Sequence, residues 1–376
     1  KMPTNEIYNR QFAILIFFAA MTFKLSNLPT FLSTSVGVNM LAAVMITVIE
    51  IVLYVLVALF IRSGGFDSLD YAYEPAQYPL MIIISLFLAL KATLFFSGAA
   101  YNVKGLMFDQ ASNELIFLTL IIPIAFMAVK GIRVIARTAE IFFPLVVFLM
   151  VFSIAFIKGN MNINYNLPLL TMPIADYAKF TLGYGLWMVD ALPFLFLSLK
   201  NHKLPYTSLG IAFSYFAVLA CIFLGNALYG NFMVKIGNLF IKVNAFNYFA
   251  EELGNLQWMG ILAWLTMTAI YLSTLYWGSI EALTRVIKKR NLAAAIILVG
   301  SLISVLVVKE ILIRSFIITP IFGYVMLGAG SACIILALSL LGLKKHKISQ
   351  KGGSGDERKD NAKDAKDIGG LKKADL

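Results

Sequence analysis

The sequence predicts an all-α membrane protein with about ten transmembrane helices. Of its 376 residues, 60% are apolar and 14% are charged, against roughly half and a quarter in soluble domains. The apolar residues recur in runs of about 20, the length that crosses about 30 Å of hydrocarbon. Most Lys and Arg residues fall in the connecting segments of one side, as the positive-inside rule requires. We therefore expect a polytopic bundle.

The apolar runs give ten expected spans. They lie near 11–33, 38–61, 79–101, 114–131, 139–157, 178–199, 208–228, 256–277, 292–308 and 316–343. The first run is too long for a signal-peptide core and has no cleavage-type ending, so it is expected to remain as a helix. The segment near 229–255 is too apolar for a free loop and too interrupted to span, which favours a short re-entrant or surface helix.

Charge and composition divide the chain into two parts. The bias of basic residues places both termini in the cytoplasm. From Lys344 onward the chain is rich in Lys, Asp, Glu, Asn and Gly, which predicts a disordered cytoplasmic tail over 344–376. Residues 1–343 form the membrane domain, with repeats at about 11–157 and 178–343.

Two expected spans carry helix-breaking residues at corresponding places. The first contains Asn27-Leu28-Pro29, and the sixth contains Gly183-Tyr184-Gly185 followed by Pro193. Proline removes a backbone donor and clashes with the preceding turn, and glycine weakens a helix. Interrupted helices in both halves are typical of 5+5 inverted-repeat transporters. The alternative is a pair of ordinary proline kinks.

Four ionisable residues fall near the middle of expected spans: Lys24, Glu50, Lys91 and Asp190. Each costs about 2.5–3.5 kcal/mol at a helix centre unless it is paired or hydrated. Four unpaired charges would cost roughly 10–14 kcal/mol, comparable to the whole stability of a domain. The two positive and two negative charges can neutralise one another, so we expect at least one Lys–acid pair. The sequence leaves the pairing open.

The positions of these charges suggest different roles. Lys24 precedes Pro29, and its amine could hold a ligand carboxylate or replace a coupling sodium ion. Asp190 precedes Pro193 and could bind a ligand ammonium group. Fixed pairs that lock helix packing are the structural alternative, which we favour for Glu50 and Lys91 in their regular spans. The predicted ligand-binding residues are Lys24, Ser26, Asn27, Gly183, Gly185, Trp187 and Asp190, with Tyr271 and Ser273 as lining groups.

The sequence carries no motif of an enzyme. Its two histidines, His202 and His346, fall in segments expected in the cytoplasm, and no phosphate loop or nucleophile–base set is present. We therefore expect no catalytic residue, cofactor or metal site. The net charge of +11 would suit nucleic acid, but the basic residues follow the membrane rule instead, so no nucleic-acid partner is expected.

Two stretches resemble a known family. The run from Gly131 through Arg137 and Glu140 to Pro144 is similar to the cytoplasmic loop and fifth helix of spore germinant receptor B-subunits, permease-like members of the amino acid–polyamine–organocation superfamily. Asn166-Leu167-Pro168-Leu169-Leu170, with Gly183 and Pro193-Phe194-Leu195, resembles that family's approach to its sixth helix. The resemblance implies a LeuT-like fold, the inner membrane of a bacterial spore, and assembly with a second membrane subunit and a lipoprotein subunit.

Three functions remain open at this point. The first is a receptor subunit that binds a small nutrient, an amino acid, in the bilayer and signals germination. The second is a proton-coupled amino acid transporter of a cell membrane. The third is a structural membrane subunit with a vestigial pocket. Arg137 and Glu140 are a possible gate, although residues three apart on a helix can also simply pair along one face.

Overall fold

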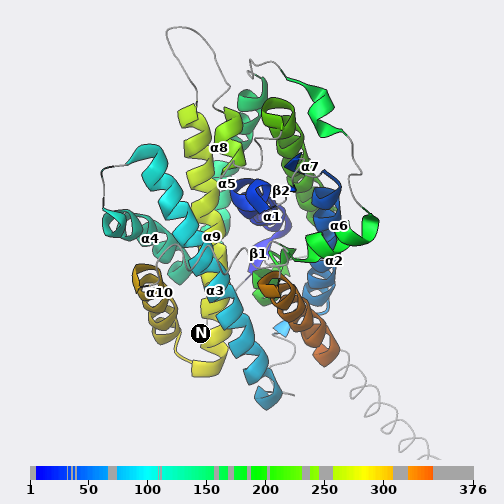
Figure 1. Cartoon of the computed structure of the whole chain (residues 1–376). Coiled ribbons are helices and arrows are strands. Elements are labelled where there is room, and N and C mark those ends of the chain that lie inside the picture. Colours follow the sequence, from blue (N-terminus) through cyan, green and yellow to red (C-terminus); the bar gives the residue numbers. More distant parts are fainter. Residues whose placement is uncertain are drawn as a thin grey trace, which may run out of the picture.

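The computed structural model of the protein is almost entirely helical (Figure 1). It describes residues 6–31, 33–34, 37–38, 40–66, 74–108, 110, 112–155, 161–167, 173–183, 188–200, 204–230, 238–244, 257–307 and 321–341. The predicted tail at 344–376 and most of the loop at 229–255 lie outside these residues. Within that loop, the short helix α8 (Leu239–Asn244) is present, with Phe240, Ile241 and Val243 buried.

The long helices occur in the order α1 (Asn9–Phe31), α2 (Met40–Arg62), α3 (Glu74–Met107), α4 (Asn113–Lys130), α5 (Ile132–Ala155), α7 (Leu204–Tyr229), α9 (Gln257–Ile287) and α10 (Arg290–Val307), and the helix Ile321–Leu341 follows. The shorter elements are η2 (Ile163–Asn166), α6 (Ile174–Leu182) and η4 (Leu192–Phe196). Strand β1 (Glu6–Tyr8) pairs in parallel with β4 (Ser198–Lys200), and β2 (Ser33–Thr34) pairs antiparallel with β3 (Gly37–Val38).

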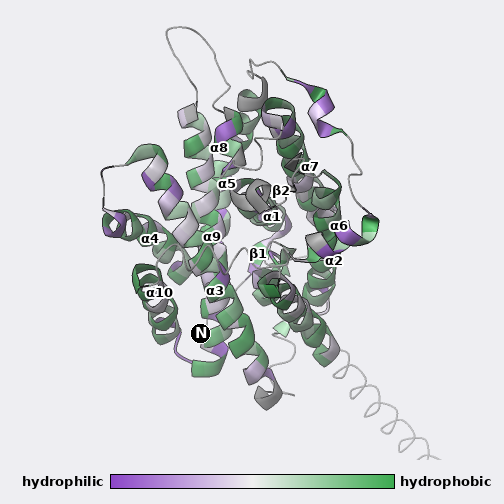
Figure 2. Ribbon diagram, viewed as in Figure 1, coloured by the Kyte–Doolittle hydropathy of each residue, from purple (hydrophilic) through white to green (hydrophobic). Residues whose placement is uncertain are grey.

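Helices α1 and α9 form the centre of the bundle. Almost every side chain from Gln11 to Ser26 in α1 is buried, and α1 packs against α5, α7 and α9. Helix α9 in turn contacts α3, α4, α5 and α10. The outer helices expose large apolar side chains, such as Val52 and Phe216, and Figure 2 shows hydrophobic residues along most of their length. Such continuous apolar surface is suited to lipid.

The chain is a multi-pass integral membrane protein. Eight described helices are long and apolar enough to cross a bilayer, and each expected span except that at 178–199 has a long helix at its position. Two boundaries differ most: the stretch from Ile132 to Thr138, interpreted as a loop, already belongs to α5, and α9 continues to Ile287, past the expected end at 277. Gly131 alone separates α4 from α5, with a φ of 102° that favours glycine. The inverted relation of two halves stays a prediction.

The expected break in the first span is absent. Helix α1 is continuous from Asn9 to Phe31 and passes through Pro29. A proline removes one backbone hydrogen bond, here the one to the carbonyl of Leu25, and membrane helices tolerate such a loss without unwinding. The Asn27-Leu28-Pro29 pattern therefore does not unwind α1, and Lys24 lies in regular helix.

The sixth span, in contrast, is interrupted. Helix α6 ends at Leu182, and the described backbone from Met188 to Ala191 is not α-helical before η4 begins at Leu192. Two glycines on other helices allow the interrupted segment to pack closely against them. A Cβ added to Gly330 would lie 2.5 Å from Cγ1 of Val189, and one added to Gly278 would lie 2.7 Å from Cβ of Pro193. Irregular backbone at this depth is thus buried in protein, as the membrane requires.

Segments expected on the N-terminal side of the membrane contact one another. Strand β1 pairs with β4, the guanidinium of Arg285 lies over the rings of Phe66 and Phe196, and Arg290 lies beside Gly131. The expected ten alternating spans would place all of these segments at one end of the bundle. The described contacts are compatible with this alternation, which stays a prediction.

Candidate functional site

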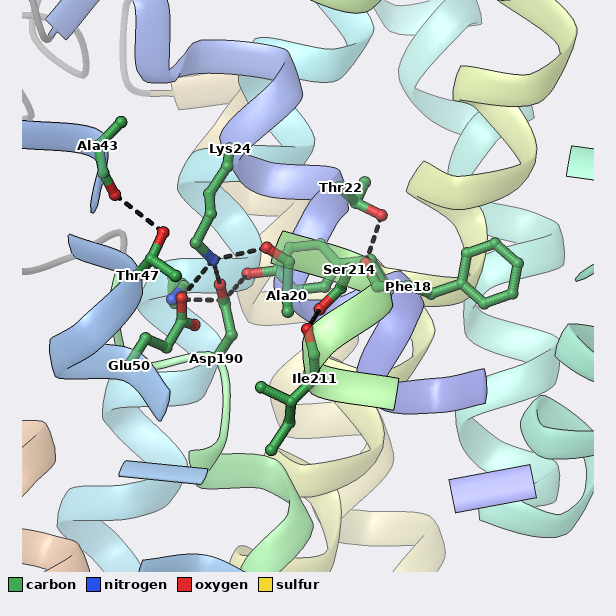
Figure 3. Close-up of polar contacts among 12 residues, drawn as sticks. Phe18, Ala20, Thr22, Lys24, Ala43, Thr47, Glu50, Asp190, Ile211 and Ser214 are labelled. Carbon is green, nitrogen blue, oxygen red and sulfur yellow. Dashed lines mark hydrogen bonds and ion pairs between the residues drawn. The ribbon is translucent and has the colours of Figure 1, made fainter. Parts of the chain in front are cut away.

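Four buried charges from four different segments meet at the centre of the bundle. Lys24 comes from α1, Glu50 from α2, Lys91 from α3, and Asp190 from the non-helical segment before η4. Each side chain is at most 1% exposed. Figure 3 shows Lys24 pointing toward both Glu50 and Asp190. We call these four residues the charge cluster.

Lys24 connects both acids. Its Nζ lies 2.6 Å from Oε2 of Glu50 and donates a hydrogen bond of 2.9 Å to Oδ2 of Asp190. It also donates a hydrogen bond of 2.7 Å to the carbonyl oxygen of Ala20, one turn earlier in α1. The lysine is therefore held against its own helix while it reaches two other segments (Figure 3).

Asp190 accepts contacts on both carboxylate oxygens. Oδ1 lies 2.7 Å from Nζ of Lys91 and accepts a hydrogen bond of 2.5 Å from the hydroxyl of Tyr271 in α9. Oδ2 accepts the hydrogen bond from Lys24. Asp190 thus joins the interrupted segment to α1, α3 and α9.

The charge cluster is electrically neutral, with two lysines and two acids. Three Lys–acid contacts of 2.6–2.9 Å are present, so the expected pairing within the membrane does form. Aromatic rings enclose it: Nζ of Lys91 lies 5.1 Å from the centre of the Phe23 ring, and Phe23 stacks on Tyr271. Such packing excludes lipid and water from the charge cluster. Breaking one of its pairs would therefore leave a buried charge without compensation.

The other predicted ligand-binding residues have different positions. Ser26 is buried in α1, where its hydroxyl donates to the carbonyl of Thr22 at 2.8 Å and accepts a 2.8 Å hydrogen bond from Nε1 of Trp264. Gly183 is a buried turn residue after α6. Three predicted residues lie outside the described side chains: Asn27, Gly185 and Trp187.

Of the two lining groups expected on α9, only Tyr271 contacts a charge. The hydroxyl of Ser273 donates to the carbonyl of Ala269 at 2.6 Å instead, the usual fate of serine in a membrane helix. The sequence interpretation missed Trp264, Tyr54 and Tyr215. One of them had a signal, because Tyr54 follows Glu50 by four residues and so lies on the same face of α2.

The pairing of Arg137 with Glu140 along α5, which was the structural alternative to a gate, does not form among the described residues, and the gate itself stays a prediction. Arg137 is exposed, whereas Glu140 pairs with Arg10 at the start of α1 and accepts a hydrogen bond of 3.0 Å from Nε2 of Gln11. Helix periodicity identified Arg137 as the neighbour of Glu140 along α5. The contact across to α1 prevails because Gln11 and Glu140 are both partly enclosed between the two helices.

Two cavities lie away from the charge cluster. One, of about 390 Å³, is lined mainly by apolar side chains of α3, α4, α5 and α9, among them Phe96 and Leu265. The other, of about 600 Å³, lies along α1, α5 and α7 and has Arg10 and Glu140 in its lining. The first has no charged lining residue, so it suits apolar rather than zwitterionic molecules.

The fold and its buried centre define a multi-pass integral membrane protein with a neutral cluster of charges at its core. Residues 78–313 match the family described as spore germination protein, the spore permeases, and the chain belongs to this family. The protein is therefore permease-like, and the resemblance inferred from the Gly131–Pro144 segment is confirmed. The matched residues include Lys91, Asp190 and Tyr271.

The chain is also similar to solved structures of a manganese transporter from Eremococcus coleocola. For one mutant of that transporter the TM-score is 0.45, with 14% identity over 89% of this chain and 78% of that chain. For the same transporter in complex with an aromatic bis-isothiourea substituted compound the TM-score is 0.43, with the same identity and coverage. No curated protein matches the chain.

Proposed function

We propose that the protein is the permease-like subunit of a spore germinant receptor, which binds an amino acid inside the membrane and signals its presence. The observation that carries the proposal is the charge cluster, in which Asp190 on an interrupted span contacts Lys24 and Lys91. Membership of the spore germination family supports the biological setting. A zwitterion is the ligand class whose two charges can each find an opposite partner among two lysines and two acids.

The cluster supports a signalling mechanism as well as binding. A ligand that exchanges one internal ion pair for its own ammonium or carboxylate group changes the contacts of the Asp190 segment. That segment touches α1, α3 and α9 through Lys24, Lys91 and Tyr271. A ligand with different affinity for two arrangements of these helices shifts their populations. Two partner subunits, namely a second membrane protein and a lipoprotein, would respond to this shift in conformation.

The proposal includes an orientation and a location. Both termini lie in the cytoplasm, and the membrane is the inner membrane of a bacterial spore. The bias of basic residues supports the orientation. The contacts of β1 with β4 and of Arg285 with Phe66 support a common side for the segments that carry this bias.

A thermal-shift screen tests the proposal. The full-length protein in lipid nanodiscs is heated with each of the twenty protein amino acids in turn. At a concentration one hundred times its Kd, a ligand stabilises the folded state by about 2.7 kcal/mol, so at least one amino acid should raise Tm by several degrees. An unchanged Tm with all twenty amino acids contradicts the proposal.

Uptake into proteoliposomes separates a receptor from a transporter. The stabilising amino acid, radiolabelled, should bind without accumulating when a proton gradient is imposed. Concentrative uptake that depends on the gradient would establish the proton-coupled transporter instead. Binding without uptake, lost in Asp190→Asn protein that still assembles, would exclude a purely structural subunit.

A further inference from the structure

The two acids of the charge cluster are held very differently. Asp190 accepts hydrogen bonds from Lys24 and Tyr271 and is paired with Lys91 as well. Glu50 has one described ion-pair partner, Lys24, at 2.6 Å. Neither carboxylate oxygen of Glu50 has a hydrogen bond of normal geometry among the described residues. The acid on the regular helix α2 is therefore the less firmly held of the two.

Two buried tyrosines lie near Glu50. Tyr54 lies one turn along α2, and Tyr215 comes from α7, which packs against α2. The hydroxyl of Tyr215 interacts with the carboxylate of Glu50, whereas the hydroxyl of Tyr54 has no such partner among the described residues. We call Glu50, Tyr54 and Tyr215 the oxygen triad.

Unpaired buried oxygens of this kind are uncommon. Roughly 90% or more of buried polar groups in proteins have a hydrogen-bond partner, and a lone exception could be strain in one side chain. Glu50 and Tyr54, one turn apart on α2, share a chemical deficit, since a carboxylate accepts and a phenol group can accept as well as donate. The triad therefore fits a group that brings several hydrogen-bond donors and a positive charge.

A primary ammonium group meets these requirements. It offers three N–H donors and no acceptor, and its charge is opposite to that of Glu50. The triad also presents an aromatic face to a cation: Nζ of Lys24 lies 5.7 Å from the centre of the Tyr215 ring, within the range of cation–π attraction.

We propose that the oxygen triad is the subsite for the amine of the ligand, and that Asp190 is a fixed anchor rather than a ligand contact. This inference rests on the proposed function and reverses the roles that the sequence suggested for Asp190 and Glu50. The ligand ammonium takes the place of Lys24 at Glu50, and the freed Lys24 amine turns to the ligand carboxylate. Because a zwitterion adds no net charge, the buried cluster remains neutral when the ligand binds.

Conservative variants test the assignment without removing the Lys24–Asp190 pair. Tyr54→Phe and Tyr215→Phe each delete one hydroxyl, and Tyr276→Phe in α9 is the matched control for a buried tyrosine outside the triad. Binding of the amino acid that most raises the wild-type Tm is measured by titration calorimetry in nanodiscs. We expect each triad variant to lose at least fivefold in affinity, Glu50→Gln to lose more than fiftyfold, and the control to bind as the wild type does.

The ligand-free protein gives a second measurement. Removing a buried hydroxyl that has no partner is neutral or stabilising, whereas removing one that is satisfied by water or protein is destabilising. The Tm of ligand-free Tyr54→Phe should therefore equal or exceed that of the wild type, since the Tyr54 hydroxyl has no described partner. A lowered Tm with unchanged affinity would mean that the triad holds water only, and would overturn the assignment.

Methylammonium chloride separates the failure of this inference from that of the proposed function. If no amino acid binds but millimolar methylammonium raises the wild-type Tm, and raises it less in Tyr215→Phe, the amine subsite holds while the amino acid receptor fails. If amino acids bind the triad variants with wild-type affinity, the subsite fails while the receptor holds. Absence of binding by every probe contradicts both.

Discussion

Lys24 and Asp190, 166 residues apart in the chain, share a buried hydrogen bond of 2.9 Å. The contact joins a continuous helix to the interrupted sixth span, so a change in the backbone around Asp190 must disturb the centre of the bundle. Lys24 holds Glu50 as well, which places one amine between two acids. Any rearrangement of this site is therefore an exchange of ion-pair partners.

The exchange of partners predicts strong coupling between Lys24 and Glu50. Lys24→Met leaves two acids with one lysine and should destabilise the protein by about 3–5 kcal/mol, the cost of an uncompensated buried charge. The double variant Lys24→Met/Glu50→Gln is neutral and should recover part of that loss. Thermal unfolding in nanodiscs measures both, with Lys179→Met as a control in which an exposed lysine, 3.9 Å from Asp176, should change stability by less than about 1 kcal/mol. A double variant no more stable than the single one contradicts the coupling.

The packing of the interrupted segment predicts intolerance at Gly330. A methyl group there would meet Val189 at 2.5 Å, and a stiff β-branched side chain has little freedom to move away. Gly330→Ala should cost about 1–3 kcal/mol through overpacking and weaken ligand binding, because Asp190 follows Val189. Gly328→Ala on the same helix, with no described atom within 4 Å of its Cβ, should be tolerated. Equal Tm values for the two variants would show that the segment is not clamped.

The hydrogen bond from Tyr271 to Asp190 predicts an effect opposite to that of Tyr54 in the oxygen triad. Tyr271→Phe removes a donor to a buried carboxylate and should destabilise the ligand-free protein by about 1.5–3 kcal/mol, the value for hydrogen bonds to charged groups. Tyr54→Phe, which removes a hydroxyl without a described hydrogen-bond partner, should not. Parallel unfolding curves for the two variants measure the difference. If both tyrosines behave alike, Asp190 is not the better-satisfied acid.

The contact between Arg10 and Glu140 predicts a selective effect on gating. Glu140→Gln weakens a largely exposed pair, so stability should change by less than about 1 kcal/mol. If the contact holds α1 and α5 together at this end of the bundle, the same variant should alter the rate at which a bound ligand leaves. Arg137→Gln, an exposed change on the same helix, should leave that rate unaltered. Identical dissociation rates for both variants and the wild type would exclude a gate at Glu140.

Much of the fold was predictable because membrane spans have a strong compositional signal. Apolar runs located the helices well, and the count of two lysines and two acids predicted internal pairing. The continuity of α1 through Pro29 was not predictable, since membrane helices tolerate a proline wherever neighbouring groups satisfy the freed backbone. The partner of Glu140 was missed for a similar reason: periodicity along one helix identified Arg137, but the contact to Arg10 is a property of helix packing.

The relative roles of the two acids could not be derived from the sequence either. Asp190 and Glu50 were distinguished only by distance from a predicted break, whereas the structure distinguishes them by the number of donors that each receives. Tyr271 was identified as a lining group, but its hydrogen bond to Asp190 depends on how α9 faces the interrupted segment. Tertiary contacts of this kind determine which charge is free to exchange partners.

The most direct test of the account is an experimental structure of the protein in nanodiscs with the amino acid that most raises its Tm. The account predicts ligand density at the charge cluster, with the 2.6 Å contact between Lys24 and Glu50 opened and the contacts of Asp190 with Lys91 and Tyr271 retained. Ligand density in another cavity, with all three lysine–acid contacts unchanged, would contradict it.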